Sequence, residues 1–134
     1  MSDEQPRSAI EHCPFCTLTA ERIVEQTHSA MLIRDAYPVS EGHSLVIPKR
    51  HVGSWFETTL DEQREMLSLL AQAKSRIESK YSPDGYNIGI NDGAAAGQTV
   101  PHLHLHLIPR YHGDSNDPRG GIRWVIPETA KYWP

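Results

Sequence analysis

The sequence predicts an α+β domain in which one long helix packs on an antiparallel sheet of about five strands. Three observations support this prediction. Short β-favouring runs occur both early and late in the chain, a single helical pattern lies between them, and no linker or repeat divides the 134 residues. A chain of this length can bury the core of one domain, so we expect a single domain over residues 1–134.

The strand candidates can be read in order along the chain. Residues 21–35, ERIVEQTHSAMLIRD, contain two β-favouring runs around Thr27–Ser29, which predicts a hairpin. The run SLVIP at 44–48 follows a glycine turn and predicts the next strand. The segment YNIGIN at 86–91 places its apolar residues on one face of a further strand.

One long amphipathic helix is predicted between these strands. Thr59 lies three residues before Glu62, which is the capping-box pattern of a helix start. The apolar residues that follow at helical spacing are Leu60, Leu67, Leu70, Ala73, Ile77 and Tyr81. The helix should end at the Pro-Asp-Gly sequence of residues 83–85.

The last predicted strand carries three alternating histidines within QTVPHLHLHLIP, residues 98–109. Residues i, i+2 and i+4 of a strand share a face, so His102, His104 and His106 should form a row on the open side of the sheet. The leucines between them then face the helix. One strand is therefore expected to build both the core and a row of imidazoles.

Such a row of imidazoles can bind a metal, or it can bring a nitrogen nucleophile and hydrogen-bond donors to a phosphate. The preceding loop, NDGAAAG at 91–97, has little side-chain bulk, so a phosphate could approach its backbone N–H groups. Gln98 and Thr99 add side-chain donors beside it. This combination favours a phosphate-binding site.

Composition restricts the partners and the compartment. The net charge of -4 provides no basic field for a nucleic-acid backbone, so no nucleic-acid partner is expected. Residues 1–12 are polar and are expected to be a flexible lead-in, without the apolar core of a signal peptide. No later run approaches a membrane span, so we expect no membrane partner and a cytoplasmic location. In a reducing compartment the pair Cys13 and Cys16 favours metal or redox chemistry.

The segment AGQTVPHLHLHLIPRYHGD, residues 96–114, resembles the signature of the histidine-triad (HIT) family. The stretch from Arg34-Asp35 to GHSLVIPKRH and the stretch YNIGINDG are also similar to that family, so the resemblance covers roughly residues 13–114. It implies the HIT fold for the whole chain, with residues 115–134 as a C-terminal extension. Within the family, the sequence looks closest to the fragile-histidine-triad and dinucleoside polyphosphate hydrolase branch.

The resemblance implies a nucleotide hydrolase or transferase that acts at an α-phosphorus. His104, the middle histidine of the triad, would be the nucleophile, and a nucleotidyl-histidine intermediate would then be resolved by water. The catalytic role of His106 would be to hold a phosphate oxygen, while Gln98 and Thr99 stabilise charge on the phosphoryl group. The nucleotide-binding residues implied are Asp35 at the ribose, Asn91, Gln98, Thr99 and His106.

A structural zinc is also implied. Some members of the family bind zinc with a cysteine pair, the histidine of a PK-x-H segment and the first triad histidine. Those positions here are Cys13, Cys16, His51 and His102. Two thiolates and two imidazoles make an acceptable tetrahedral zinc site, and a closed site of four ligands supports geometry instead of activating water. A free or redox-active cysteine pair is the alternative.

Other functions remain open at this stage. The substrate could be a dinucleoside polyphosphate or a nucleoside phosphoramidate, and the base preference and leaving group are undetermined. The protein could instead be a nucleotide-binding sensor or adaptor with negligible turnover, or a zinc-handling protein that uses the triad as metal ligands. The family resemblance also suggests a homodimer. No chemistry is expected of the remaining histidines, His12, His28, His43 and His112.

Overall fold

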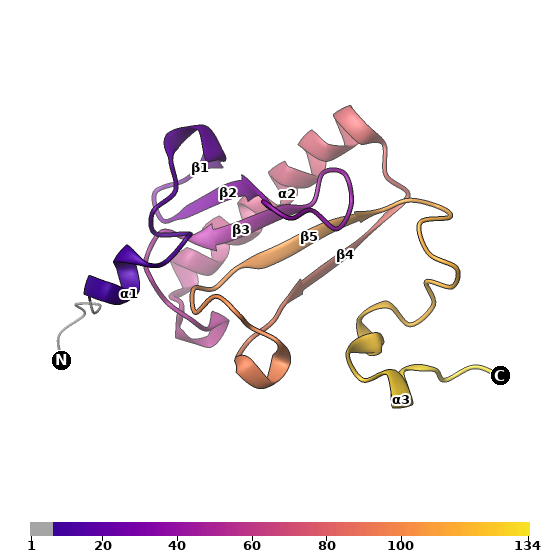
Figure 1. Ribbon diagram of the computed structural model, residues 1–134. Helices are drawn as coiled ribbons and strands as arrows, with labels where there is room; N and C mark the ends of the chain where they lie inside the picture. Colours follow the sequence, from indigo (N-terminus) through magenta and orange to yellow (C-terminus); the bar gives the residue numbers. More distant parts are fainter. Residues whose placement is uncertain (1–6) are drawn as a thin grey trace.

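The structure is a computed structural model that describes residues 7–134. One antiparallel sheet of five strands, in the order β1-β2-β3-β5-β4, carries the long helix α2 across one face (Figure 1). The strands are β1 (Ile23–Gln26), β2 (Ala30–Arg34), β3 (Ser44–Pro48), β4 (Gly85–Ile90) and β5 (Leu105–Arg110). The predicted α+β class and sheet are confirmed.

The helical elements are the long α2, two short α-helices and four 3-10 turns. They are α1 (Arg7–Glu11), η1 (Ala20–Arg22), η2 (Trp55–Glu57), α2 (Leu60–Tyr81), η3 (Ala94–Ala96), η4 (Gly121–Val125) and α3 (Pro127–Ala130). The helix α1 lies within the segment expected to be a lead-in, of which residues 1–6 fall outside the described residues. The C-terminal segment with η4 and α3 lies beyond the end of β5 (Figure 1). No helix in the described range 7–134 is long and apolar enough to cross a membrane.

The predicted hairpin forms between β1 and β2, where the Thr27 N–H donates to the Ala30 carbonyl at 2.9 Å. The sheet then continues through β3 to β5 and ends at β4. Because β4 pairs only with β5, one of its edges has no strand partner within residues 7–134. Such an edge presents unpaired backbone groups.

Helix α2 begins with the predicted capping box. The Glu62 N–H donates to the Thr59 hydroxyl at 3.1 Å, and the Thr59 N–H donates to the Glu62 carboxylate at 2.8 Å. The buried face differs from the predicted stripe, because Leu60 and Leu67 are 69% and 52% exposed. Leu67 lies six residues before the buried Ala73, which places it about 120° away around the helix.

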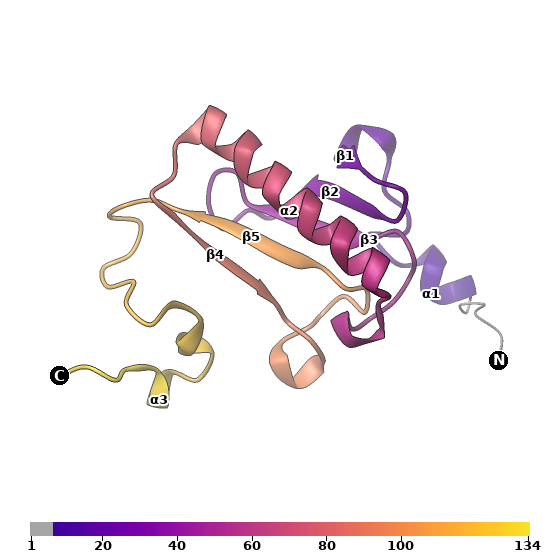
Figure 2. The ribbon, with the colours of Figure 1, turned by 180° about the vertical axis from the view of Figure 1, so that it is seen from behind.

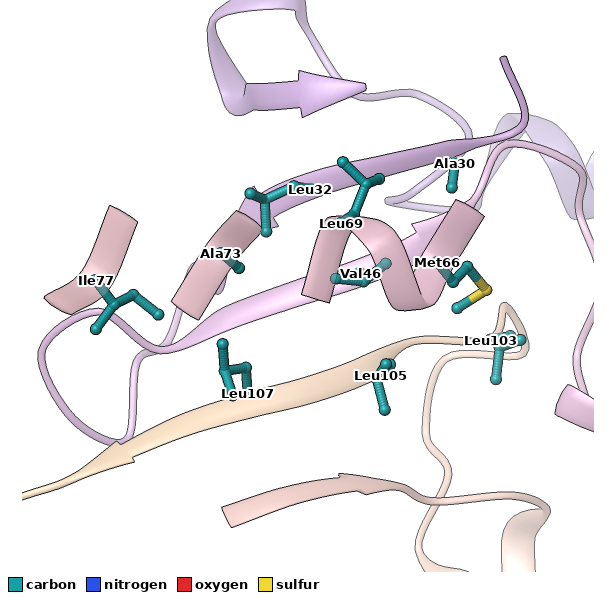
Figure 3. Close-up of a cluster of buried hydrophobic side chains, with 10 residues drawn as sticks. All are labelled: Ala30, Leu32, Val46, Met66, Leu69, Ala73, Ile77, Leu103, Leu105 and Leu107. Carbon is teal, nitrogen blue, oxygen red and sulfur yellow. The ribbon is translucent and has the colours of Figure 1, made fainter. Parts of the chain in front are cut away.

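The core lies between α2 and the sheet (Figures 2 and 3). Its buried residues are Ala30, Leu32, Val46, Met66, Leu69, Ala73, Ile77, Leu103, Leu105 and Leu107. The leucines of the histidine segment therefore face the helix, as predicted. A second cluster, on Ile33, Leu45 and Ile47, packs against Phe15 and Leu18 of the N-terminal segment. This segment covers part of the sheet face opposite α2.

Candidate active site and metal centre

The histidine segment is only partly a strand. β5 begins at Leu105, so His102 and His104 precede it, and the Leu103 N–H bonds to the Val52 carbonyl at 2.7 Å. His102 is fully buried, whereas His104 and His106 are half-buried. The prediction of three imidazoles on an open face is therefore wrong for His102, whose ring is enclosed beside the cysteine pair.

The four predicted metal ligands meet in one cluster. The ligand atoms of Cys13, Cys16, His51 and His102 all lie within 4.8 Å of one another. Nδ1 of His102 is 3.3 Å from the Cys13 sulfur and 3.2 Å from Nδ1 of His51, which is 3.2 Å from the Cys16 sulfur. A tetrahedral zinc places two nitrogens about 3.3 Å apart, and a nitrogen and a sulfur about 3.6 Å apart. The donor set therefore fits a zinc ion.

The hydrogen bonds of His102 support the same interpretation. Its Nε2 is 2.8 Å from the Pro48 carbonyl, which can only accept, so Nε2 carries the hydrogen and Nδ1 offers a lone pair to the cluster. Burial, followed by the hydrogen bond and charge of Cys13, raises the pKa of the Cys16 thiol to about 12. A Cys16 thiolate at this place therefore needs a cation, and a bound divalent ion would reverse the shift.

His104 is oriented by the backbone. Its Nδ1 lies 2.8 Å from the His102 carbonyl, so Nδ1 carries the hydrogen. Nε2 of the neutral ring is then unprotonated, and it has no hydrogen-bond partner within residues 7–134. A ring nitrogen in this state is a competent nucleophile.

His106 has the opposite tautomer, which is fixed by His43. The Val39 N–H donates to Nδ1 of His43 at 3.0 Å, so the hydrogen of the neutral His43 ring is on Nε2. That Nε2 lies 3.0 Å from Nδ1 of His106 and donates to it. The hydrogen of His106 is therefore on Nε2. His104 thus offers a lone pair, and His106 a donor.

Burial favours the neutral form of the His106 and His43 rings. It lowers the pKa of His106 to about 4, with further lowering by the charges of His104 and His43. Burial also lowers the pKa of His43, against the opposing effect of Asp35. The Asp35 carboxylate lies 3.4 Å from His43 Nε2 through one oxygen and accepts the Tyr37 N–H at 2.8 Å through the other. Both carboxylate oxygens keep a free lone pair for a ligand.

Most of the predicted nucleotide site faces one cavity of about 360 Å³. The residues around it that the sequence predicted are Asp35, Asn91, Thr99, His104 and His106. An apolar wall of Pro14, Phe15, Leu18 and Leu45 completes the cavity. The Phe15 ring contacts His104 at a centroid distance of 5.1 Å and stands between the two cysteines in the sequence. The arrangement can hold a nucleoside at one end and a phosphate at the other.

Gln98 does not line this cavity. Its side-chain N–H groups donate to the carbonyls of Gly53 at 2.9 Å and Val100 at 3.1 Å, and its side-chain oxygen accepts the Gly93 N–H at 2.8 Å. To donate to a phosphate, Gln98 must release one of these carbonyls. The side chain joins the loop to neighbouring backbone in this structure.

The loop offers fewer free backbone N–H groups to a phosphate than expected. The N–H groups of Ala96, Gly97 and Gln98 donate to carbonyls within the loop, and the Gly93 N–H is bound to Gln98. The expectation that these N–H groups face a phosphate is therefore wrong for these residues. Gly93 and Gly97, with φ of 95° and 94°, allow the tight turn.

His43 and Phe15 were missed as site residues. The signal for His43 was available, because it lies two residues before Leu45, which pairs with His106 across β3 and β5. Residues i and i+2 of an extended chain share a face, so this register places both imidazoles on one side. No feature of the sequence alone places the Phe15 ring against His104.

Comparison with known proteins gives a consistent result. The model of the HIT domain matches residues 18–113. A HIT-like protein of Mycoplasma genitalium is 39% identical over 111 residues, which span 78% of this chain and 77% of that one. The asymmetrical bis(5'-nucleosyl)-tetraphosphatase of Schizosaccharomyces pombe is 41% identical over 80 residues, or 60% of this chain and 44% of that one.

One solved structure with the same fold holds zinc. The zinc-bound histidine triad family protein of Mycobacterium smegmatis superposes with a TM-score of 0.70 at 35% identity, over 81% of each chain.

Proposed function

Because this chain belongs to the HIT domain family, we propose that it is a hydrolase that cleaves nucleoside phosphates at the α-phosphorus through a nucleotidyl-histidine intermediate. The observation that carries this proposal is the pair of opposite tautomers in one cavity. His104 presents an unprotonated Nε2, and His106 presents an N–H. A phosphate at this place would meet a nucleophile and a donor together.

The reaction has two displacements. The lone pair of His104 Nε2 forms a bond to the α-phosphorus, and the bond from phosphorus to the leaving oxygen breaks, so that the leaving group takes its electron pair. Water then attacks the same phosphorus and loses a proton to the solvent. The electron pair of the N–P bond returns to Nε2 of His104, and a nucleoside monophosphate is released. The two steps replace one difficult displacement by easier ones.

Residues around the phosphate stabilise its charge. The Nε2–H of His106 would hold a non-bridging oxygen, and the side chains of Thr99 and Asn91 lie at the same cavity. Gln98 would join them once its amide releases Gly53 or Val100. Donors aimed at the developing charge are commonly the largest contribution to such catalysis.

Asp35 would bind the ribose of the nucleoside. Its two carboxylate oxygens each keep a lone pair after their contacts with Tyr37 and His43, which suits two ribose hydroxyl hydrogens. The base would lie against the apolar wall at Phe15 and Leu18, which reads a ring by shape. We therefore expect a ribonucleotide substrate.

The preferred substrate in this proposal is a dinucleoside polyphosphate. The AGQTV segment and the similarity to the tetraphosphatase of Schizosaccharomyces pombe support it. A nucleoside phosphoramidate is the second candidate, since the same attack at phosphorus would break a P–N bond. A nucleotide sensor would keep the cavity without turnover.

A structural zinc would be held by Cys13, Cys16, His51 and His102. When bound, the ion would fix geometry and leave no open position for substrate. Its place matters because His102 lies two residues before His104, and the His102 carbonyl orients the nucleophilic ring. The similarity to a zinc-bound relative supports the proposal.

A homodimer is also proposed. The outer edge of β4 has no strand partner within the described chain, and the C-terminal segment exposes Ile122, Val125 and Ile126 at 61%, 73% and 56%. An unpaired edge beside exposed apolar side chains is a surface that a second copy could cover. Sedimentation equilibrium of the full chain tests this, with a monomer at micromolar concentration as the contrary result.

Turnover tests the function. Purified protein and a His104→Ala variant receive diadenosine tetraphosphate and adenosine phosphoramidate in parallel, and AMP release is followed by chromatography. We expect turnover of the tetraphosphate that disappears in the variant. Turnover of the phosphoramidate alone selects the other branch, while AMP binding without any turnover selects the sensor.

A further inference from the structure

Residues 51–55, called the strap below, connect the two parts of the site. The strap begins at His51, a ligand of the four-residue cluster. Residues 91–98, whose Asn91 lines the cavity, are called the phosphate-facing loop below. The next two carbonyls of the strap accept hydrogen bonds from this loop and from the segment after it: Gly53 from the Gln98 side chain at 2.9 Å, and Val52 from the Leu103 N–H at 2.7 Å. The strap thus runs alongside the loop from the metal cluster.

Asp92 makes the remaining connections. One oxygen of its half-buried carboxylate accepts both the Ser54 hydroxyl and the Trp55 N–H, each at 3.0 Å. The acceptor is a carboxylate, so both hydrogen bonds are charge-assisted. Such hydrogen bonds are stronger than those between two neutral groups. The two bonds hold the start of the loop at the far end of the strap.

The loop depends on these anchors for its position. Between Asp92 and Gln98 it contains only glycine and alanine, all of them exposed. A Cβ added to Gly93 or Gly97 would meet no atom within 4 Å. Apolar packing therefore holds little of the loop, and the hydrogen bonds at its two ends fix it to the strap.

The anchors lie directly beside residues of the cavity. Asn91 precedes Asp92, and Thr99 follows Gln98, and both line the cavity with His104. A misplacement of about 1 Å at a reacting centre can cost a hundredfold in rate. The side chains proposed to hold a phosphate thus lie next in sequence to the residues that anchor the loop.

We propose that Asp92 is a positioning residue, which locks the phosphate-facing loop onto the strap and thereby holds the loop and the Cys13/Cys16/His51/His102 cluster in one fixed arrangement. This inference rests on the proposed function for its kinetic consequence. Its structural consequence is independent of turnover, because the strap also carries His51. Loss of Asp92 should therefore loosen the metal cluster as well as the loop.

The matched pair Asp92→Ala and Asp92→Asn tests this proposal. Asparagine keeps one side-chain oxygen, which can accept from both Ser54 and Trp55, whereas alanine removes the acceptor. The control is Asp61→Ala, because Asp61 is 84% exposed in its side chain and pairs with the exposed Arg64 at 3.3 Å. All variants are compared as zinc-loaded full chains with melting temperatures recorded.

We expect Asp92→Ala to lower kcat by about 10- to 100-fold, and Asp92→Asn to stay within about threefold of the unaltered protein. The Kd for adenosine, which carries no phosphate, should change less than about threefold in both, because Asp92 bonds to Ser54 and Trp55 and not to Asp35 or the apolar wall. Equal losses in both variants, or a kcat unchanged by Asp92→Ala, would overturn the proposal.

The metal readout separates this proposal from the proposed function. Zinc transfer to a chromogenic chelator is expected to be at least about fivefold faster from Asp92→Ala than from Asp92→Asn or Asp61→Ala. If no variant turns over any nucleotide, the proposed function fails. A faster zinc transfer from Asp92→Ala would still support the link between Asp92 and the cluster. If zinc leaves all proteins at one rate, the link between Asp92 and the cluster is wrong.

Discussion

Substitution of His43 by asparagine or glutamine separates the two hydrogen bonds that this ring makes. An asparagine side chain reaches the position of the imidazole Nδ1, and a glutamine side chain reaches the position of Nε2. His43→Asn can therefore still accept the Val39 N–H, but it ends short of His106. His43→Gln can still donate to Nδ1 of His106, while the contact with Val39 is lost.

The size of the loss in activity follows from the cost of leaving Nδ1 of His106 without a hydrogen-bond donor. In His43→Asn, Nδ1 of the half-buried His106 ring loses its donor, and the ring is free to adopt the other tautomer, whose Nε2 cannot donate to phosphate. A buried polar atom without a partner costs about 1–3 kcal/mol. This corresponds to a roughly 5- to 150-fold loss of kcat/KM. We expect a loss of less than about fivefold in His43→Gln.

The assay is the pH profile of kcat/KM for diadenosine tetraphosphate, with His28→Gln on the exposed hairpin turn as control. Because the charge of His43 contributes to the lowered pKa of His106, removing it should also move the acidic limb of the profile to higher pH. Equal activity of the asparagine and glutamine variants would refute the tautomer assignment. An acidic limb that stays at the same pH in both would show that the charge of His43 does not lower the pKa of His106.

Three further predictions concern the metal, the ribose and the pH dependence of folding. Metal analysis should find one zinc per chain, and more than one zinc per chain would indicate that the triad binds metal. The Cys16→Ala variant should lose tight zinc binding, and its melting temperature should fall by about 10 °C or more. Asp35→Asn should lower kcat/KM about tenfold for a ribonucleotide substrate and much less for its 2'-deoxy analogue, and an equal loss for both would remove Asp35 from the ribose. Burial lowers the pKa of His106 and of metal-free His102 to about 4, below the 6.5 of an unfolded chain, so the unfolded state binds more protons between these values. Stability is therefore retained above pH 6.5 and falls as the pH drops towards 4. Scanning calorimetry of chelator-treated protein should show a decrease of at least about 10 °C in this window, against no slope if the rings are charged in the folded state.

The sequence predicted the elements well where local patterns decide them. The capping box at Thr59 and the alternation of leucines in the histidine segment each correspond to a feature of the structure. The predicted helix stripe is wrong at Leu60 and Leu67, because the buried face of α2 contains Met66 and Leu69 instead. The periodicity of apolar residues predicts that α2 is a helix, but the sheet that packs against α2 determines which face is buried.

Tertiary contacts determine what the sequence could not show about the site. The cluster of cysteines and histidines was anticipated only through a family resemblance, because its members lie up to 89 residues apart. The hydrogen bonds of Gln98 to Gly53 and of Asp92 to Ser54 join loops that no local pattern relates. The tautomers of His104 and His106 likewise depend on carbonyl and imidazole partners outside the local sequence pattern.

Covalent trapping on His104 gives the most direct test of the proposed chemistry. The protein is mixed with excess diadenosine tetraphosphate, quenched in alkaline denaturant within milliseconds to seconds, digested and analysed by mass spectrometry. We predict one adenylyl group on the peptide that contains His104, with none in a His104→Ala variant. Steady turnover without any adduct, or an adduct that persists in the variant, would contradict the nucleotidyl-histidine mechanism.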